Sequence, residues 1–168
     1  MKKFELTSET KINIFGKKLF RIKALISFGD VEAGETGGWV EKEGNVNQSG
    51  DAWVYGDAMV SGDAMVYGNA MVYGNAMVSG DAWVYGDAMV SGDARVYGDA
   101  DYTTIHGFGT QFRTTTFFRC KDKKVRVACG CFFGTIPEFR EQVKNTRKGK
   151  IAEEYLMIAD LMEKHFEK

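Results

Sequence analysis

The side chains most suited to binding a charged ligand are a group of cations beside aromatic rings. Six basic residues lie within fourteen positions near three phenylalanines: Arg113, Arg119, Lys121, Lys123, Lys124 and Arg126, with Phe112, Phe117 and Phe118. Because cations attract phosphate groups and aromatic rings stack on bases, this pattern is typical of a nucleotide-binding or nucleic-acid-binding segment. The alternatives are a solvated hairpin and a segment that docks on an acidic surface of the same chain.

Few other residues have the chemistry of a catalyst or a metal ligand. His106 is a candidate general base, and the second histidine, His165, lies near the end of the sequence. Cys120, Cys129 and Cys131 are an odd number of thiols with a Cys-x-Cys spacing, whereas a structural zinc site needs four ligands, usually in two spaced pairs. We therefore expect no metal and no cofactor, and we interpret the cysteines as small, reduced, buried side chains.

The net charge of −1 conceals a strong segregation of charge along the chain. Residues 50–103 carry one basic and eight acidic side chains, whereas residues 112–150 carry eleven basic and three acidic ones. No apolar run is long enough to span a membrane, and the first five residues lack the apolar core of a signal peptide. We therefore expect a cytoplasmic protein with no membrane partner.

A six-residue repeat precedes the basic segment and must position it. Its eight regular units, from Gly50 to Tyr97, consist of Gly, Asp or Asn, Ala, a variable residue, Val, and Tyr or Ser. Glycine followed by aspartate or asparagine favours a tight corner. Because Asn69 and Asn75 stand where other units have aspartate, turn formation explains the recurring aspartates more simply than a row of calcium sites does. Because side chains alternate across a strand, Ala and Val face one side, a narrow interior, and the larger residues face outward.

This repeat resembles that of the hexapeptide-repeat left-handed β-helix proteins, in which an aliphatic residue is followed four places later by a small one. Val54 with Ala58, and Val60 with Ala64, match that pattern. The resemblance implies a left-handed parallel β-helix in which three units form one coil of about eighteen residues. With a degenerate ninth unit at Gly98, the repeat predicts about three coils.

Every third unit then stacks, which predicts three outward faces. They carry Trp53, Met71 and Met89 on the first face, Met59, Met77 and Arg95 on the second, and Met65, Trp83 and Asp101 on the third. These faces are too apolar to be left bare in water, so we expect the chain's own ends, a second copy or a target to cover them. The candidate binding residues on them are Trp53, Trp83, Tyr55, Tyr73, Tyr85 and Arg95.

The segments on either side of the repeat have a different character. We divide the chain into an N-terminal cap (1–43), a β-helix (44–103) and a C-terminal α+β appendage (104–168). Alternating apolar and basic residues predict a half-buried strand at 18–25 in the cap, which is therefore a β cap.

The appendage is predicted to hold a β-hairpin and two helices. Residues 114–119 and 125–129 favour the two strands of the hairpin. Thr135 and Glu138 form a capping box that begins one helix, with Pro137 in its first turn, and a second helix follows near Lys150.

The flanking segments extend the resemblance to the whole chain. Leu19 to Ala24, Gly37 to Glu43 and Cys129 to Phe132 are similar to segments of bacterial and phage hexapeptide-repeat proteins, some of which are named as acyltransferases. A phage setting implies an anti-defence role, such as an anti-CRISPR-like inhibitor that binds a host immune protein or its nucleotide signal. Acyltransferases on this scaffold place a general-base histidine in a cleft between subunits, whereas here no histidine lies in the repeats.

We therefore predict a non-enzymatic binding protein, with a protein as the principal partner. Aromatic and methionine-rich surfaces suit such contacts and also suit a homo-oligomer, either a dimer or a trimer. One alternative is a nucleotide or nucleic-acid binder that uses the basic segment 112–150. The other is a hexapeptide-repeat acyltransferase with His106 as its base.

Overall fold

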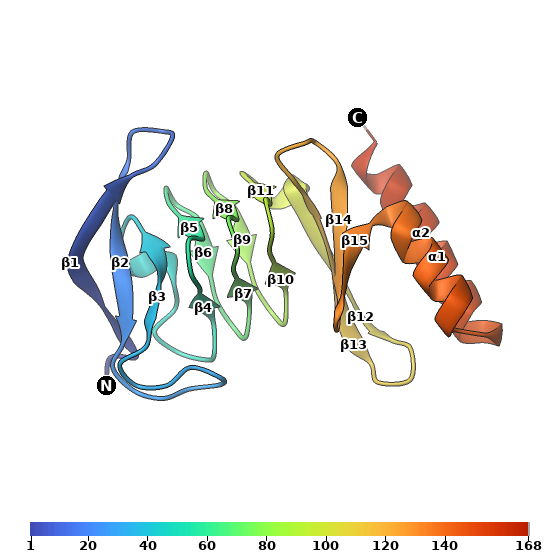
Figure 1. The fold of residues 1–168 in the computed structure, drawn as a ribbon, viewed down its shortest axis with the longest axis horizontal. Coiled ribbons are helices and arrows are strands. Elements are labelled where there is room, and N and C mark those ends of the chain that lie inside the picture. The colour runs from blue at the N-terminus through green and yellow to red at the C-terminus, as the bar shows by residue number, and fades with distance from the viewer. Residues whose placement is uncertain (168) are drawn as a thin grey trace.

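The repeats fold into a β-solenoid of about three turns, which lies between N-terminal antiparallel strands and a C-terminal four-stranded sheet with two helices (Figure 1). The computed structural model describes residues 1–167. Its repeat strands have two residues each: β4 (Trp53–Val54), β5 (Met59–Val60), β6 (Met65–Val66), β7 (Met71–Val72), β8 (Met77–Val78), β9 (Trp83–Val84), β10 (Met89–Val90) and β11 (Arg95–Val96). The corner glycines between them have positive φ, as at Gly50 (φ 71°), which is why glycine recurs there.

Parallel pairing confirms the predicted spacing of the coil. Trp53 pairs with Met71, and Met71 pairs with Met89, so equivalent residues are eighteen apart. The three faces are the sheets β4–β7–β10, β3–β5–β8–β11 and β6–β9. The prediction that Asp101 continues the third face is wrong. The ninth unit lacks the Ala-x-Val strand and forms the short 3-10 helix η2 (Asp99–Asp101) instead.

The interior of the solenoid is lined by alanine and valine, as predicted. All sixteen of these side chains in the eight regular units, from Ala52 to Val96, have no exposed surface. Small side chains fit because the tube is narrow, and their burial is the main favourable contribution to its stability. This outcome confirms that the bulky residues at the variable position face outward.

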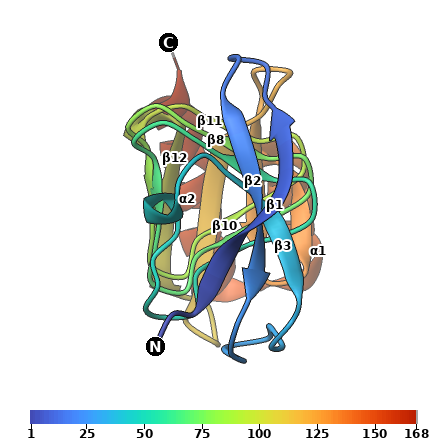
Figure 2. The ribbon, with the colours of Figure 1, turned by 90° about the vertical axis from the view of Figure 1, so that its left-hand side faces the viewer.

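The N-terminal strands cover the first coil (Figure 2). β1 (Phe4–Ile12) pairs with β2 (Lys18–Ala24), and β2 pairs with β3 (Thr36–Val40), all antiparallel. β3 then pairs in parallel with β5, so this segment also contributes a side of the solenoid before the 3-10 helix η1 (Glu43–Asn45).

The C-terminal sheet has one face on the solenoid and the other on the helices (Figure 1). Its strands are β12 (Tyr102–Phe108), β13 (Arg113–Arg119), β14 (Val125–Cys129) and β15 (Phe132–Thr135), in that order and antiparallel. Phe118 joins the core of the solenoid, whereas its neighbour Phe117 joins the core beneath the helices α1 (Ile136–Thr146) and α2 (Gly149–Phe166). The alternation of side chains across β13 therefore builds both cores.

The predicted hairpin is β13–β14, and the two outer strands were missed. β12 contains Gly107 and polar residues, and β15 contains Gly134, so neither shows the apolar alternation that predicts a strand. The predicted start of α1 is confirmed, because Thr135 caps the helix and Glu138 completes the capping box. In the described residues, no helix is both long enough and apolar enough to cross a bilayer.

Candidate functional site

One face of the solenoid keeps its aromatic side chains in contact with solvent. On the β6–β9 face, Trp83 is 49% exposed and Tyr85 is 52% exposed. We call the residues Met65, Tyr67, Trp83 and Tyr85 the aromatic face. It offers large, partly exposed aromatic side chains to another molecule.

Stacking between coils holds the rings of the aromatic face in place. The rings of Tyr67 and Tyr85 are stacked, with centroids 5.4 Å apart and planes at 17°. Trp83 meets Tyr67 edge-on at 6.1 Å. Tyr102 donates a hydrogen bond from its hydroxyl to the carbonyl oxygen of Trp83 at 2.6 Å, which joins the face to the C-terminal sheet. Desolvation, and secondarily the neighbouring Tyr85, raises the pKa of Tyr67.

Exposed aspartates surround the aromatic face at the corners of the coils. Asp81 and Asp87 are exposed beside β9, and a carboxylate oxygen of Asp87 accepts a hydrogen bond from Asn69 at 3.0 Å. A carboxylate oxygen of Asp99 accepts one from the backbone N–H of Trp83 at 2.9 Å. The surface thus combines an apolar centre with a negatively charged rim.

Trp53 does not lie on a free binding surface, contrary to the prediction. Its side chain has no exposed surface, because the rings of Phe4 and Phe28 pack edge-on against it at 5.8 and 5.3 Å. At the other end of the same face, the hydroxyl oxygen of Thr116 accepts a hydrogen bond from the backbone N–H of Met89. The two ends of the chain therefore cover the first face, which was one of the expected outcomes.

The other predicted solenoid residues are partly covered. Tyr55 and Tyr73 are half-buried, and the hydroxyl of Tyr55 lies 3.9 Å from the sulfur of Met71. Desolvation is the main cause that raises the pKa of Tyr55. Arg95 donates hydrogen bonds to the carbonyl oxygens of Asn75 and Ala94, at 3.0 and 2.8 Å, so its guanidinium lies along the solenoid surface.

The predicted basic group is divided between the two ends of a strand. Arg113 begins β13, whereas Lys121, Lys123 and Lys124 are exposed at the turn that follows it. A seven-residue strand spans roughly 20 Å, so these cations do not form one cluster.

Two members of the basic group make internal contacts. The Arg119 guanidinium lies 3.3 Å from the carboxylate of Asp101, and it donates a hydrogen bond to the carbonyl oxygen of Phe166 at 2.9 Å. Arg126 forms an ion pair with Asp122 at 2.7 Å. Phe117 and Phe118, which were expected to stack on bases, are fully buried and cannot do so.

His106 and the three cysteines lie on or beside the strands of the C-terminal sheet. His106 is exposed on β12, and its Nδ1 lies 3.0 Å from the hydroxyl oxygen of Thr114. Burial raises the pKa of the Cys120 thiol to about 11. Cys129 Sγ lies 3.2 Å from the hydroxyl of Thr115. In this described part, no three His, Cys, Asp or Glu side chains gather as metal ligands would.

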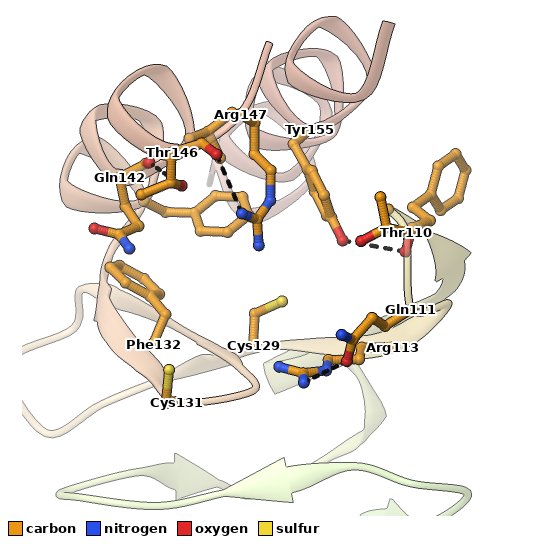
Figure 3. A pocket seen from close by; sticks show the side chains of 14 residues that line it. Thr110, Gln111, Arg113, Cys129, Cys131, Phe132, Gln142, Thr146, Arg147 and Tyr155 are labelled. Carbon is orange, nitrogen blue, oxygen red and sulfur yellow. Dashed lines mark hydrogen bonds between the residues drawn. The ribbon is translucent and has the colours of Figure 1, made fainter.

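A cavity of about 270 Å³ lies between the C-terminal sheet and the helices (Figure 3). We call it the C-terminal cavity. Arg113 and Cys129 line it from the sheet, and Arg147 and Tyr155 line it from the helices. Of these residues only Arg113 was predicted to bind a ligand, whereas Cys129 was interpreted as a small buried side chain. Arg147 and Tyr155 were missed as site residues because they reach the cavity only through the packing of α1 and α2.

The repeat sequence matches a known family model. Residues 52–68, 64–79, 71–86 and 82–98 match the family described as YdcK Beta solenoid repeat. The repeat region is therefore similar to the YdcK β-solenoid repeat family. The YdcK-type match agrees with the observed solenoid and covers the repeats alone, so it identifies the fold of that region. No curated protein matches the chain. The left-handed sense that the resemblance implies stays a prediction.

Proposed function

We propose that the protein is a non-enzymatic binding protein whose docking surface is the aromatic face. The observation that carries this proposal is the exposure of about half of the surface of Trp83 and of Tyr85 on a rigid solenoid. Tryptophan and tyrosine are the residues that most often dominate the binding energy of an interface. Their rings are already ordered by stacking, so little conformational entropy is lost on binding.

The charge around the aromatic face favours a protein partner that presents basic side chains. Asp81, Asp87 and Asp99 lie at its rim, and aromatic rings attract cations. An arginine-rich or lysine-rich segment can place its aliphatic stems and charged ends against such a surface. The resemblance implies an anti-defence role, in which the partner would be a host immune protein. This role stays a prediction.

Acyl transfer has weaker support. His106 is exposed and is not among the residues that line the C-terminal cavity. Its ring nitrogen contacts a threonine hydroxyl, an arrangement that orients the ring without activating it as a base.

The proposal is tested by photo-crosslinking in a host lysate, with a photoreactive amino acid in place of Tyr67. The captured protein is then made in pure form and its affinity is measured for Trp83→Ala with Tyr85→Ala. We expect affinity to fall by roughly a thousandfold, because two residues of this kind contribute about 2 kcal/mol or more each. Added salt should weaken the complex, because the partner is basic.

The matched control is Met157→Ala with Leu161→Ala, which removes two exposed apolar side chains from α2. This control should leave affinity unchanged. The proposal is wrong if the control abolishes binding while the aromatic-face variant binds normally. Sedimentation analysis provides a second test, since a homodimer that Trp83→Ala dissociates would mean that a second copy occupies the face.

A further inference from the structure

We propose that the C-terminal cavity binds a small molecule that carries a phosphate group, held between Arg113 and Arg147. This site is separate from the aromatic face and does not depend on the function proposed for it. The cavity volume of about 270 Å³ is just below the range of about 300–1,000 Å³ that is typical of small-molecule sites.

The charge of the cavity favours an anion. Its lining includes two guanidinium groups, and none of the described residues that line it is acidic. The other three arginines of the C-terminal region, Arg119, Arg126 and Arg140, each form an ion pair with a carboxylate. Within residues 1–167, Arg113 and Arg147 form none, so their charge remains available to a ligand.

The two arginines reach the cavity from opposite walls (Figure 3). Arg113 comes from the start of β13, and it donates a hydrogen bond to the side-chain oxygen of Gln111 at 2.6 Å. Its guanidinium lies against Gly130, where a Cβ would collide with it and where φ is 59°. Arg147 follows the end of α1 and donates a hydrogen bond to the carbonyl oxygen of Thr146 at 3.2 Å. Both groups are therefore oriented before a ligand arrives.

The number of donors favours phosphate over carboxylate. Each guanidinium has five N–H donors, and a phosphate monoester offers three oxygens and up to two negative charges to accept them. A carboxylate has only two oxygens and one charge, so it can bridge two separate arginines less well. The last carbonyl groups of α1 place a partial negative charge near Arg147. The two full positive charges of Arg113 and Arg147 are larger than this partial charge.

The remaining walls fit the body of a small aromatic molecule. Phe132 provides an apolar ring on one side of the cavity, and Gln142 lies above it at the edge of the cavity in Figure 3. The hydroxyl of Tyr155 is held by the carbonyl oxygen of Phe108 at 3.2 Å, so it bounds the cavity on the other side. An aryl group or a base can stack on the phenylalanine while its phosphate lies between the arginines.

The proposal is tested on the full chain by calorimetric titration with phenyl phosphate, benzoate and inorganic phosphate at one ionic strength. Phenyl phosphate should bind about tenfold or more tightly than benzoate, because it gains charge-assisted hydrogen bonds. Arg113→Gln and Arg147→Gln should each weaken phenyl phosphate binding by about tenfold or more. The matched control is Lys148→Gln, an exposed cation next to Arg147 that does not line the cavity, and it should change affinity less than twofold.

Three results would each overturn the proposal. The first is that neither phosphate probe binds. The second is that benzoate binds as tightly as phenyl phosphate. The third is that Lys148→Gln weakens binding as much as Arg147→Gln does, which would indicate general attraction to a basic surface. The comparison of probes on the unaltered protein remains decisive even if an arginine variant unfolds, which its melting temperature would reveal.

Discussion

Two identical hexapeptides offer a direct measure of what covering a solenoid face contributes to stability. Residues 50–55 and 80–85 both read Gly-Asp-Ala-Trp-Val-Tyr. Trp53 in the first is fully buried, whereas Trp83 in the second is 49% exposed. The perturbation is the same in each case, Trp53→Ala or Trp83→Ala, so local propensity cannot distinguish the two variants.

The expected loss follows from the buried area. A fully buried tryptophan removes roughly 200 Å² from water, which at about 25 cal/mol per Å² contributes roughly 5 kcal/mol. The Nε1 of Trp53 is buried without a hydrogen-bond partner among the described residues. Removing this group relieves a desolvation cost of about 1–3 kcal/mol, which partly offsets the loss of stability. The cavity left behind adds to the loss, so Trp53→Ala should lower the free energy of unfolding by about 3–5 kcal/mol. Trp83 buries about half of that area, and its removal leaves no closed cavity, so Trp83→Ala should lower the free energy of unfolding by roughly 2.5 kcal/mol or less.

Urea unfolding followed by circular dichroism measures both values, with the midpoint and slope fitted separately. Trp53→Ala should move the midpoint to clearly lower urea at an unchanged slope. Phe4→Ala is a further check, because it removes a ring that packs against Trp53 and makes no change around Trp83. Equal losses for the two tryptophan variants, or a larger loss for Trp83→Ala, would refute the account of covered and free faces.

Three other predictions concern the corners, the cap and the first helix. Gly50→Ala should destabilise the protein more than Gly56→Ala: both positions have positive φ, but only at Gly50 would a Cβ lie 2.6 Å from a carbonyl oxygen of the next coil. Urea unfolding of both variants measures this difference. Burial lowers the pKa of Lys3 to about 8, so the charged form is disfavoured in the folded state. The free energy of unfolding should therefore rise as the pH goes from about 8 towards the unfolded value of 10.5, and Lys3→Met should remove this rise in a pH series of unfolding curves. Thr135→Ala removes the hydroxyl that accepts from the Glu138 backbone N–H at 3.4 Å, and thermal unfolding should show a loss of about 1 kcal/mol.

The repeat and its interior could be predicted because they depend on local patterns. Glycine and Asx at every sixth position predict the corners, and strand alternation predicts that Ala52 and Val54 share one side. A narrow tube admits only small side chains, which places that side inside. The start of α1 was equally predictable, because Thr135 and Glu138 lie within one helical turn.

The candidate sites could be predicted only in part. Arg113 was identified from its charge, but Arg147 lies thirty-four residues later and meets it only across the cavity. The basic segment was expected to be continuous because its cations are close in sequence, whereas β13 separates Arg113 from Lys121. Distance along an extended strand is large even when the separation in sequence is small.

The amino-acid sequence by itself determined the six-residue repeat, its buried alanines and valines and the outward direction of its tryptophans, whereas the resemblance supplied the coil of eighteen residues. Only the tertiary structure decided which tryptophan is free, since the units around Trp53 and Trp83 are identical. The physical reason is that exposure depends on what packs against a face. Phe4 and Phe28, distant in sequence, bury Trp53, while Trp83 remains half exposed.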